Sequence, residues 1–214
     1  MLLIGLPYAA IALFVAGVIW RYRNPLTITA RSSQILESRW LAFGAVPFHA
    51  GVLTLFAGHL IPLLFPTQWR AFVSNRTALL TVETIGTAAA IHCLAGLVIL
   101  FVRRITLRPP ARVADLVVLT ILIAQVALGL AVAVLHRWGA VWSASTVIPY
   151  LRSIVTLQPD PSLVAGVPTL MTLHLAGAWI VLALIPFTRL VHMFSLPLGY
   201  LVRPPQKVIW GGGR

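Results

Sequence analysis

Five long apolar segments constrain this chain more than any other feature of its sequence. They cover about residues 2–20, 40–65, 80–102, 115–135 and 167–194. At about 1.5 Å of rise per residue, each is long enough to cross the roughly 30 Å hydrocarbon core of a bilayer as a helix. None alternates with period two, and lipid cannot satisfy open strand edges. The sequence therefore predicts an all-α membrane protein, a single transmembrane domain over residues 1–214.

Composition supports this class and excludes others. Hydrophobic residues make up 59% of the chain and charged residues only 9%, whereas a soluble domain has roughly a quarter charged residues. The single cysteine, Cys93, excludes an internal disulfide and any cluster or zinc site built on cysteines. The net charge of +12 reflects membrane topology and contact with lipid headgroups or partner subunits, and we expect no nucleic-acid partner.

The basic residues indicate how the helices are oriented. Eleven lie in the first and third connections and the tail, against four in the second and fourth connections. The side with more basic residues has Arg21, Arg23, Arg31, Arg39, Arg103, Arg104, Arg108, Arg112, Arg203, Lys207 and Arg214. By the positive-inside rule this side faces the cytoplasm, which predicts an N-terminus outside and a C-terminus inside. The longest connection, about residues 136–166, then faces outside and contains a short surface helix near residues 148–157.

Four of the six histidines lie in the second and fifth predicted helices. These are His49 and His59, and His174 and His192. Ionisable groups inside a membrane are candidates for function. Because the two helices run in opposite directions, equal depth pairs His59 with His174 near the outside and His49 with His192 near the inside. His174 and His192 are eighteen residues apart, so they return to the same helix face and are separated by about 27 Å of rise. His49 and His59 are ten residues apart and are separated by about 15 Å of rise.

Two imidazoles facing each other at matched depth, twice, suit two b-type haems with six-coordinate iron. Small residues flank the histidines and either make room for the macrocycle or simply let helices pack closely. They are Ala50, Gly51, Ala57, Gly58, Ala176 and Gly177. Interhelical hydrogen bonds and a proton-coupled transporter are the alternatives. The acidic residues nearest the spans, Glu83 and Asp115, lie at their ends, where a transporter would not place them.

Several stretches resemble the membrane cytochrome b (gamma) subunit of the respiratory nitrate reductase and nitrite oxidoreductase family. The stretches extend over nearly the whole chain, and the histidine spacings and the PFTRLVH block are the most specific. They are SSQIL at 32–36, FHAGVLTLFAGH at 48–59, CLAGLVIL at 93–100, ADLVVL at 114–119, QVALGL at 125–130, SIVTL at 153–157, LHLAG at 173–177 and PFTRLVHMFSLPLGYL at 186–201.

The resemblance implies a five-helix cytochrome in the inner membrane with two haem b groups. His59 and His174 would be the axial ligands of the outer haem iron, and His49 and His192 those of the inner one. The subunit would oxidise quinol on the outer side and pass electrons through the outer and then the inner haem. They would reach an iron–sulfur (beta) subunit and a molybdenum catalytic (alpha) subunit, where nitrate is reduced. Cytochrome b subunits of formate dehydrogenase, hydrogenase or sulfur-pathway complexes are related alternatives.

Three further residues and one missing lysine bear on this hypothesis. Arg189 either pairs with a haem propionate or extends to the inner headgroups. We expect His92 to be a buried, hydrogen-bonded histidine and His136 an interface anchor beside Arg137 and Trp138. Some family members have a lysine after the second helix, associated with quinol, whereas the only lysine here is Lys207. This leaves open a nitrite oxidoreductase gamma-type subunit, with electrons moving in the opposite direction.

Overall fold

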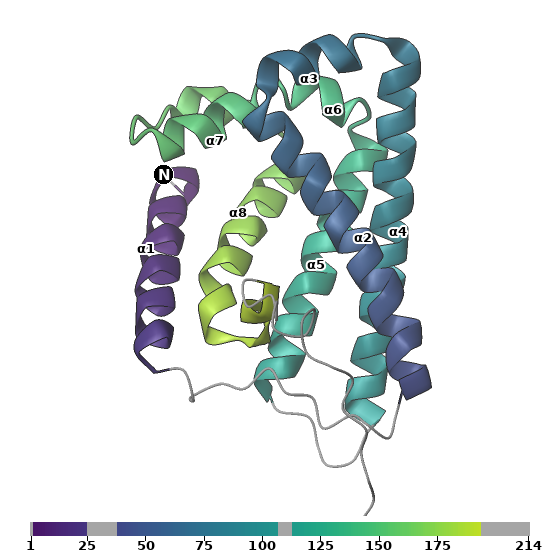
Figure 1. The fold of residues 1–214 in the computed structure, drawn as a ribbon. Coiled ribbons are helices and arrows are strands. Elements are labelled where there is room, and N and C mark those ends of the chain that lie inside the picture. The colour runs from purple at the N-terminus through teal and green to yellow at the C-terminus, as the bar shows by residue number, and fades with distance from the viewer. Residues whose placement is uncertain (1, 25–37, 107–112, 194–214) are drawn as a thin grey trace, which may run out of the picture.

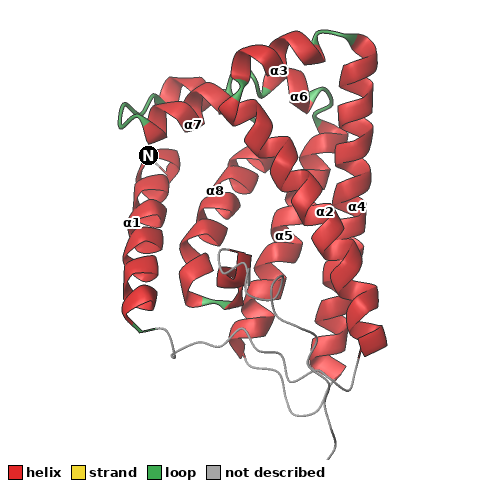
Figure 2. Cartoon of the chain, in the orientation of Figure 1, coloured by secondary structure: helices red, strands yellow, loops and turns green. Residues whose placement is uncertain are grey.

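The computed structural model describes residues 2–24, 38–106 and 113–193, which contain helices and no strand (Figures 1 and 2). The five long helices are α1 (Leu2–Arg23), α2 (Ser38–Leu64), α4 (Arg76–Thr106), α5 (Val113–Leu135) and α8 (Thr169–Leu184). With the turn after α8 included, all five are long and apolar enough to span a membrane. The predicted all-α architecture with five spans is confirmed.

The start of α4 shows why its predicted boundary, residue 80, is too late. Asn75 precedes the helix, and its side-chain oxygen accepts hydrogen bonds from the backbone N–H groups of Thr77 (2.9 Å) and Ala78 (3.1 Å). An asparagine in this position satisfies N–H groups that have no partner within the helix. The helix therefore begins with a polar turn that lies before the apolar stretch.

The predicted span over about residues 167–194 contains Pro186, which can kink a helix, and α8 ends just before this residue. Pro186 has no backbone N–H and its ring obstructs a continuing helix, so α8 ends at Leu184. Two short 3₁₀ segments follow, η2 (Ile185–Phe187) and η3 (Arg189–Met193). Between them Thr188 is extended (φ −129°, ψ −179°). The chain turns back at the end of α8 instead of continuing along its axis (Figure 1).

Four short elements lie across one end of the bundle and form what we call the cap layer (Figure 1). They are α3 (Pro66–Val73), α6 (Gly139–Trp142), α7 (Val147–Val155) and η1 (Pro161–Val164). The predicted surface helix near residues 148–157 is confirmed as α7. Helices α3 and α6 were not predicted, because short segments with mixed composition give no apolar span to detect. The N-terminus of the chain lies at this same end (Figure 1).

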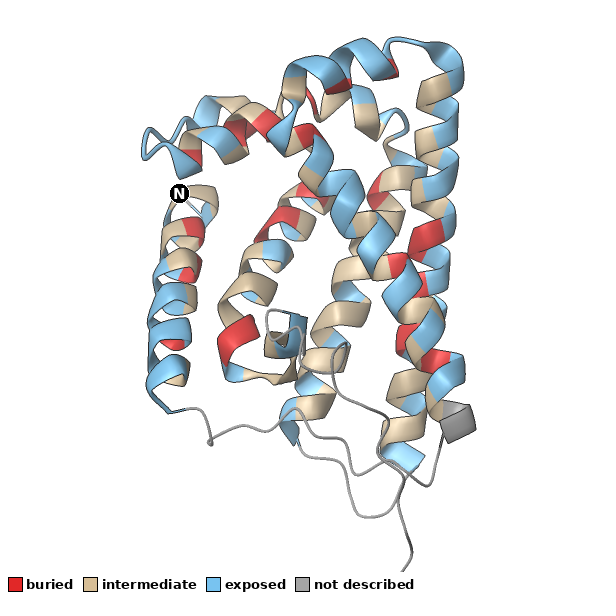
Figure 3. Cartoon of the chain, viewed as in Figure 1, coloured by how far each residue is buried: buried red, intermediate tan, exposed pale blue. Residues whose placement is uncertain are grey.

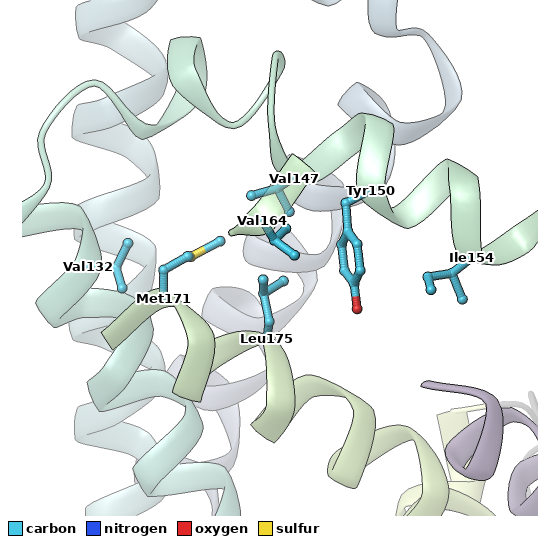
Figure 4. Packing of buried hydrophobic residues seen from close by; sticks show 7 residues of the cluster. All are labelled: Val132, Val147, Tyr150, Ile154, Val164, Met171 and Leu175. Atoms are coloured by element: carbon cyan, nitrogen blue, oxygen red, sulfur yellow. The ribbon is translucent and has the colours of Figure 1, made fainter. Parts of the chain in front are cut away.

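The main buried cluster lies where the cap layer meets the long helices (Figure 4). Its members are Val132, Val147, Tyr150, Ile154, Val164, Met171 and Leu175. Tyr150 is fully buried and its hydroxyl donates a hydrogen bond to the Leu3 carbonyl (2.5 Å). Burial raises the pKa of this phenol above its usual value, so the hydroxyl keeps the proton that it donates. The cluster thereby attaches α1 to α7.

The sides of the long helices are exposed along much of their length (Figure 3). Large apolar residues such as Phe43 (69% exposed), Leu53 (65%) and Val134 (58%) lie on these surfaces. A lipid-facing helix needs apolar residues outside as much as inside. The distribution of buried residues is therefore that of a bundle immersed in lipid and capped by a packed layer at one end.

Helices α2 and α4 pack closely because glycines remove the side chains between them. A Cβ atom added at Gly96 would lie 2.5 Å from the Phe48 nitrogen and 2.6 Å from the Gly44 oxygen. One added at Gly51 would lie 2.6 Å from the Ala89 oxygen. Backbones can approach this closely only where small residues line the interface. The contact fixes which side of α2 faces α4 and leaves other sides of α2 for the histidines.

We expect Gly96→Ala to lower the stability of the protein by about 1–3 kcal/mol, because the new methyl group overlaps the α2 backbone. The midpoint of thermal denaturation of the purified protein in detergent measures this effect. Gly5→Ala in α1 is the matched control, since a Cβ there meets nothing within 4 Å. Equal denaturation midpoints for the two variants would contradict the close approach of α2 and α4.

Candidate functional site

The structure brings the four histidines together in two pairs. The ring centres of His59 and His174 are 6.3 Å apart, with an angle of 44° between the rings. Those of His49 and His192 are 6.0 Å apart, with an angle of 64°. One member of each pair lies on α2, and the other lies on α8 or just after it. These are the partners that equal depth assigned from the sequence.

The break after α8 explains how His192 comes to lie beside His49. His192 is in η3 and not on α8, so the argument that eighteen residues return to the same helix face does not apply. On α2 the two histidines are separated by about 15 Å of rise, and a continuous helix would have carried His192 about 27 Å from His174. Because the chain turns back after Pro186, both pairs form at matched levels.

Each of the four imidazoles is oriented by a hydrogen bond from its Nδ1 atom to a backbone carbonyl. The acceptors are Ala45 for His49 (2.7 Å), Leu55 for His59 (2.6 Å), Gln125 for His174 (3.1 Å) and Arg189 for His192 (2.7 Å). A carbonyl can only accept, so Nδ1 carries the proton and Nε2 retains its lone pair. Histidines that bind metals are oriented by contacts of this kind.

Helix α5 holds His174 through Gln125 and Gly129. The Gln125 amide Nε2 donates to the His174 backbone carbonyl (3.0 Å), while the His174 ring donates to the Gln125 backbone carbonyl. A Cβ added at Gly129 would lie 2.8 Å from Cε1 of the His174 ring, so a side chain there would displace the ring. Gln125 belongs to the QVALGL stretch but has no predicted role, although a polar amide in an apolar helix is itself a signal.

The donor set limits what each pair can hold. Each pair has two imidazoles, and no group of three or more His, Cys, Asp or Glu side chains within residues 2–24, 38–106 and 113–193 could hold a metal ion. A structural zinc ion takes four protein ligands, whereas haem iron takes two axial ligands because its macrocycle supplies the other four. Two imidazoles are therefore enough for a haem and too few for a structural zinc ion.

The spacing of the pairs also fits an iron between them. A bond from a metal to imidazole is about 2.0–2.1 Å long and the ring centre lies roughly 1.2 Å behind the nitrogen, so two opposed ligands have ring centres about 6.4 Å apart. The observed separations are 6.3 and 6.0 Å. The residues thus fit two six-coordinate haem irons, in donor number and in spacing.

Comparison with known proteins places this arrangement in a family. The family model described as nitrate reductase gamma subunit matches residues 1–211. The chain belongs to this family. It is 35% identical over 205 residues to the nitrate reductase gamma chain of Bacillus subtilis, covering 92% of each protein. It is 32% identical over 211 residues to the respiratory nitrate reductase 1 gamma chain of Escherichia coli, covering 94% of this chain and 93% of that one.

The chain also matches part of a longer relative. The nitrate reductase-like protein NarX of Mycobacterium tuberculosis is 38% identical over 208 residues. The match covers 92% of this chain but only 32% of NarX, so the chain spans about a third of the length of that relative. The resemblance to the nitrate reductase gamma subunit family is confirmed, and the five spans make the chain a multi-pass membrane protein.

His92 is only partly as predicted. Its Nδ1 lies 2.8 Å from the Ala88 carbonyl, as expected for a hydrogen-bonded histidine. However, its side chain is exposed and not buried, so that part of the prediction is wrong. It contributes to neither histidine pair.

His136 lies at the end of α5 that meets the cap layer. Its backbone carbonyl accepts a hydrogen bond from Trp142 Nε1 (3.2 Å), and the Arg137 guanidinium lies 5.2 Å from the centre of the Trp138 ring. His136 lines an open cavity of about 560 Å³, together with Arg137, Trp142, Thr146, Ser162, Leu163, Gly166, Val167 and Pro168. Aromatic and basic side chains gathered at a helix end are typical of a membrane interface.

The glycines beside the histidines differ in what they do. Gly51 packs α2 against α4, and a Cβ at Gly177 would lie 2.1 Å from Gln125 Oε1. These two serve the close packing of helices. By contrast, a Cβ at Gly58 would meet nothing within 4 Å. Gly58 is therefore the one of these three glycines that helix packing does not require.

Arg189 makes an ion pair that sequence analysis did not foresee. Its Nε atom lies 3.3 Å from Asp115 Oδ1, and its side chain is 42% exposed. Asp115 was noted only as an acidic residue at the end of a span. The sequence could not pair them, since they are 74 positions apart and the contact depends on the turn after α8.

Proposed function

We propose that this chain is the membrane anchor and electron-transfer subunit of a nitrate reductase-type molybdenum complex, and that it binds two haem b groups. His59 and His174 are the axial ligands of the outer haem iron, and His49 and His192 those of the inner one. The observation that carries the proposal is the presence of two isolated pairs of imidazoles at the separation required by an iron. Family membership supports the same function.

The protein's part in this function is to fix the ligands and the surroundings of each haem, and a bound haem supplies a one-electron carrier. The Nδ1 hydrogen bonds orient all four rings, and α5 adds a second support at His174. Arg189 is half-exposed beside His192, so its guanidinium also has a side that can pair with an inner propionate. His49, His59 and His192 are exposed within this chain, and imidazoles at membrane depth need a bound group to cover them.

In this proposal the subunit lies in the cytoplasmic membrane with the cap layer outside. The charge distribution predicts an external N-terminus, and the N-terminus lies at the cap end (Figure 1). Quinol is oxidised on the outer side, where its protons are released. The electrons leave at the inner side to an iron–sulfur subunit and then to a molybdenum subunit. The many arginines predicted on the inner side suit contact with these partners or with lipid headgroups, and several of them lie outside the described residues.

A proton-coupled transporter is less well supported by the same contacts. A transporter needs carboxylates that can bind and release protons within the membrane. Instead, Glu83 Oε1 accepts a hydrogen bond from the Ala140 backbone N–H (2.8 Å), and Asp115 is paired with arginines. Both carboxylates have structural partners, Glu83 in the cap layer and Asp115 at the opposite end of the bundle.

The pyridine haemochrome assay on purified protein tests the proposal, together with a reduced-minus-oxidised spectrum. About two b-type haems per chain would support it, and folded protein without haem would overturn it. Reduction of the haems by a quinol analogue then tests the direction of electron flow. Reduction only through a co-purified iron–sulfur subunit would instead indicate the direction of a nitrite oxidoreductase.

We expect His59→Ala and His174→Ala to abolish the same haem, the outer one, and to leave the inner haem visible in the spectrum. His49→Ala and His192→Ala should remove the inner haem. The reason is that loss of one axial ligand leaves a six-coordinate iron without its opposed imidazole. Haem content and redox titration measure the result. If His59→Ala and His49→Ala removed the same haem, the assignment of pairs would be wrong.

We also expect Gly129→Val to weaken the outer haem selectively, because the new side chain would overlap the His174 ring. The low-spin spectrum of the outer haem should decrease or shift while that of the inner haem persists. Gly5→Val is the control, since a Cβ at Gly5 meets nothing within 4 Å. An unchanged outer haem in Gly129→Val would contradict the described contact between α5 and His174.

A further inference from the structure

The segment that carries His192 is poorly held by its own helix. Helix α8 ends eight residues earlier, and no residue of η3 (Arg189–Met193) is buried. A single 3₁₀ turn is a weak element by itself, because its hydrogen bonds have poor geometry. The position of His192 therefore depends on contacts from other helices.

Three hydrogen bonds, made by the side chains of Arg21 and Thr188, fix the beginning of this segment. Arg21 Nη1 on α1 donates to the Pro186 carbonyl (3.1 Å). Thr188 Oγ1 donates to the Leu184 carbonyl (2.9 Å) and accepts from the Leu190 backbone N–H (3.3 Å). These contacts hold η2, the turn and the Leu190 N–H, but none of them involves Arg189, whose carbonyl orients the imidazole.

Asp115 on α5 contacts Arg189, which lies three residues before His192. Its Oδ1 lies 3.3 Å from Arg189 Nε, and its Oδ2 accepts a hydrogen bond from Arg104 Nη2 at 2.5 Å. One carboxylate thus joins α4, α5 and η3. The Asp115 side chain is only 16% exposed, and charge-assisted contacts of this kind are stronger than neutral ones, particularly where water is scarce.

Arg189 connects the Asp115 carboxylate to His192. Its side chain is held by Asp115, and its backbone carbonyl accepts the hydrogen bond from His192 Nδ1 (2.7 Å). The carboxylate therefore acts on the residue that sets the direction of the imidazole. Of the three carboxylates in the described part of the chain, Asp115 is the one at this end of the bundle, since Glu83 and Asp160 belong to contacts at the cap end.

Removal of the carboxylate would do more than delete one contact. Arg104 Nε is already buried without a hydrogen-bond partner among the described residues. Without Asp115, the guanidinium groups of Arg104 and Arg189 would face each other with no negative charge between them. Their repulsion would push η3 away from α4, and the Arg189 carbonyl would move with it.

We propose that Asp115 is a positioning residue for His192. Its carboxylate holds the 3₁₀ segment after the broken helix α8 at the distance and orientation that the inner imidazole pair needs. This inference rests on the proposed function for its readout, because the orientation of His192 is observed through the inner haem. Asp115 itself touches neither of the inner histidines in any contact described above.

The test compares Asp115→Asn with the wild type and with Asp115→Glu, using purified protein with its haems bound. The readouts are the low-spin ferric EPR signal and the redox midpoint of each haem, assigned with His49→Ala. We expect Asp115→Asn to keep both haems and to shift the EPR signal and the midpoint of the inner haem only. Asp115→Glu keeps the charge and should restore the wild-type signal at least in part.

Glu83→Gln is the matched control, because it neutralises a half-buried carboxylate at the opposite end and should leave the inner signal unchanged. If Asp115→Asn fails to fold, the double variant Asp115→Asn/Arg104→Gln removes the unpaired cation while still releasing Arg189. It should show the same inner shift. An inner signal identical to that of the wild type in the folded variant would overturn the inference. Wild-type protein without haem would overturn the proposed function instead.

Discussion

The break in the last long helix is the constraint on which the arrangement of histidines depends. Pro186 ends the regular hydrogen bonding of α8, and the chain that follows turns back. Without this turn, His192 would lie about 27 Å along the helix from His174, far beyond the level of His49. A proline that weakens one helix thereby makes both imidazole pairs possible. The loss of helix is offset by Thr188, Arg21 and Asp115, which come from three different parts of the chain.

Helix α2 acts as the fixed side of the site. Gly51 and Gly96 bring α2 and α4 together along one face, and His49 and His59 project from other faces toward α8 and the segment after it. The histidines on the opposing side are held by other elements, because His174 depends on α5 and His192 depends on the ion pairs of Asp115. The two pairs therefore differ in support. One is braced by neutral hydrogen bonds and close packing, and the other by charges.

The sequence was sufficient for features that depend on local composition. It predicted five spans, their approximate bounds, the surface helix α7 and, from depth, which histidines meet. It failed where the outcome depended on distant contacts. The short helices α3 and α6 are stabilised by contacts such as that of Trp69 with the Ala140 carbonyl (3.0 Å). The ion pair of Asp115 with Arg189 needed the turn after α8, and the amount by which Pro186 would bend the helix could not be known from its presence alone.

The position of α1 in the fold has a consequence for biosynthesis. Its hydrogen bonds reach residues near the other end of the chain, from Tyr8 to the Ile154 carbonyl and from Arg21 to the Pro186 carbonyl. The ribosome makes α1 before α8, so the surface on which α1 packs does not exist until α8 has been synthesised. Until then, helix α1 must lie in the lipid without its packing partner, while α2 and α4, which are consecutive spans, can already associate. Helix α1 therefore packs into the bundle only after α8 has been made, although it precedes α2 and α4 in the chain.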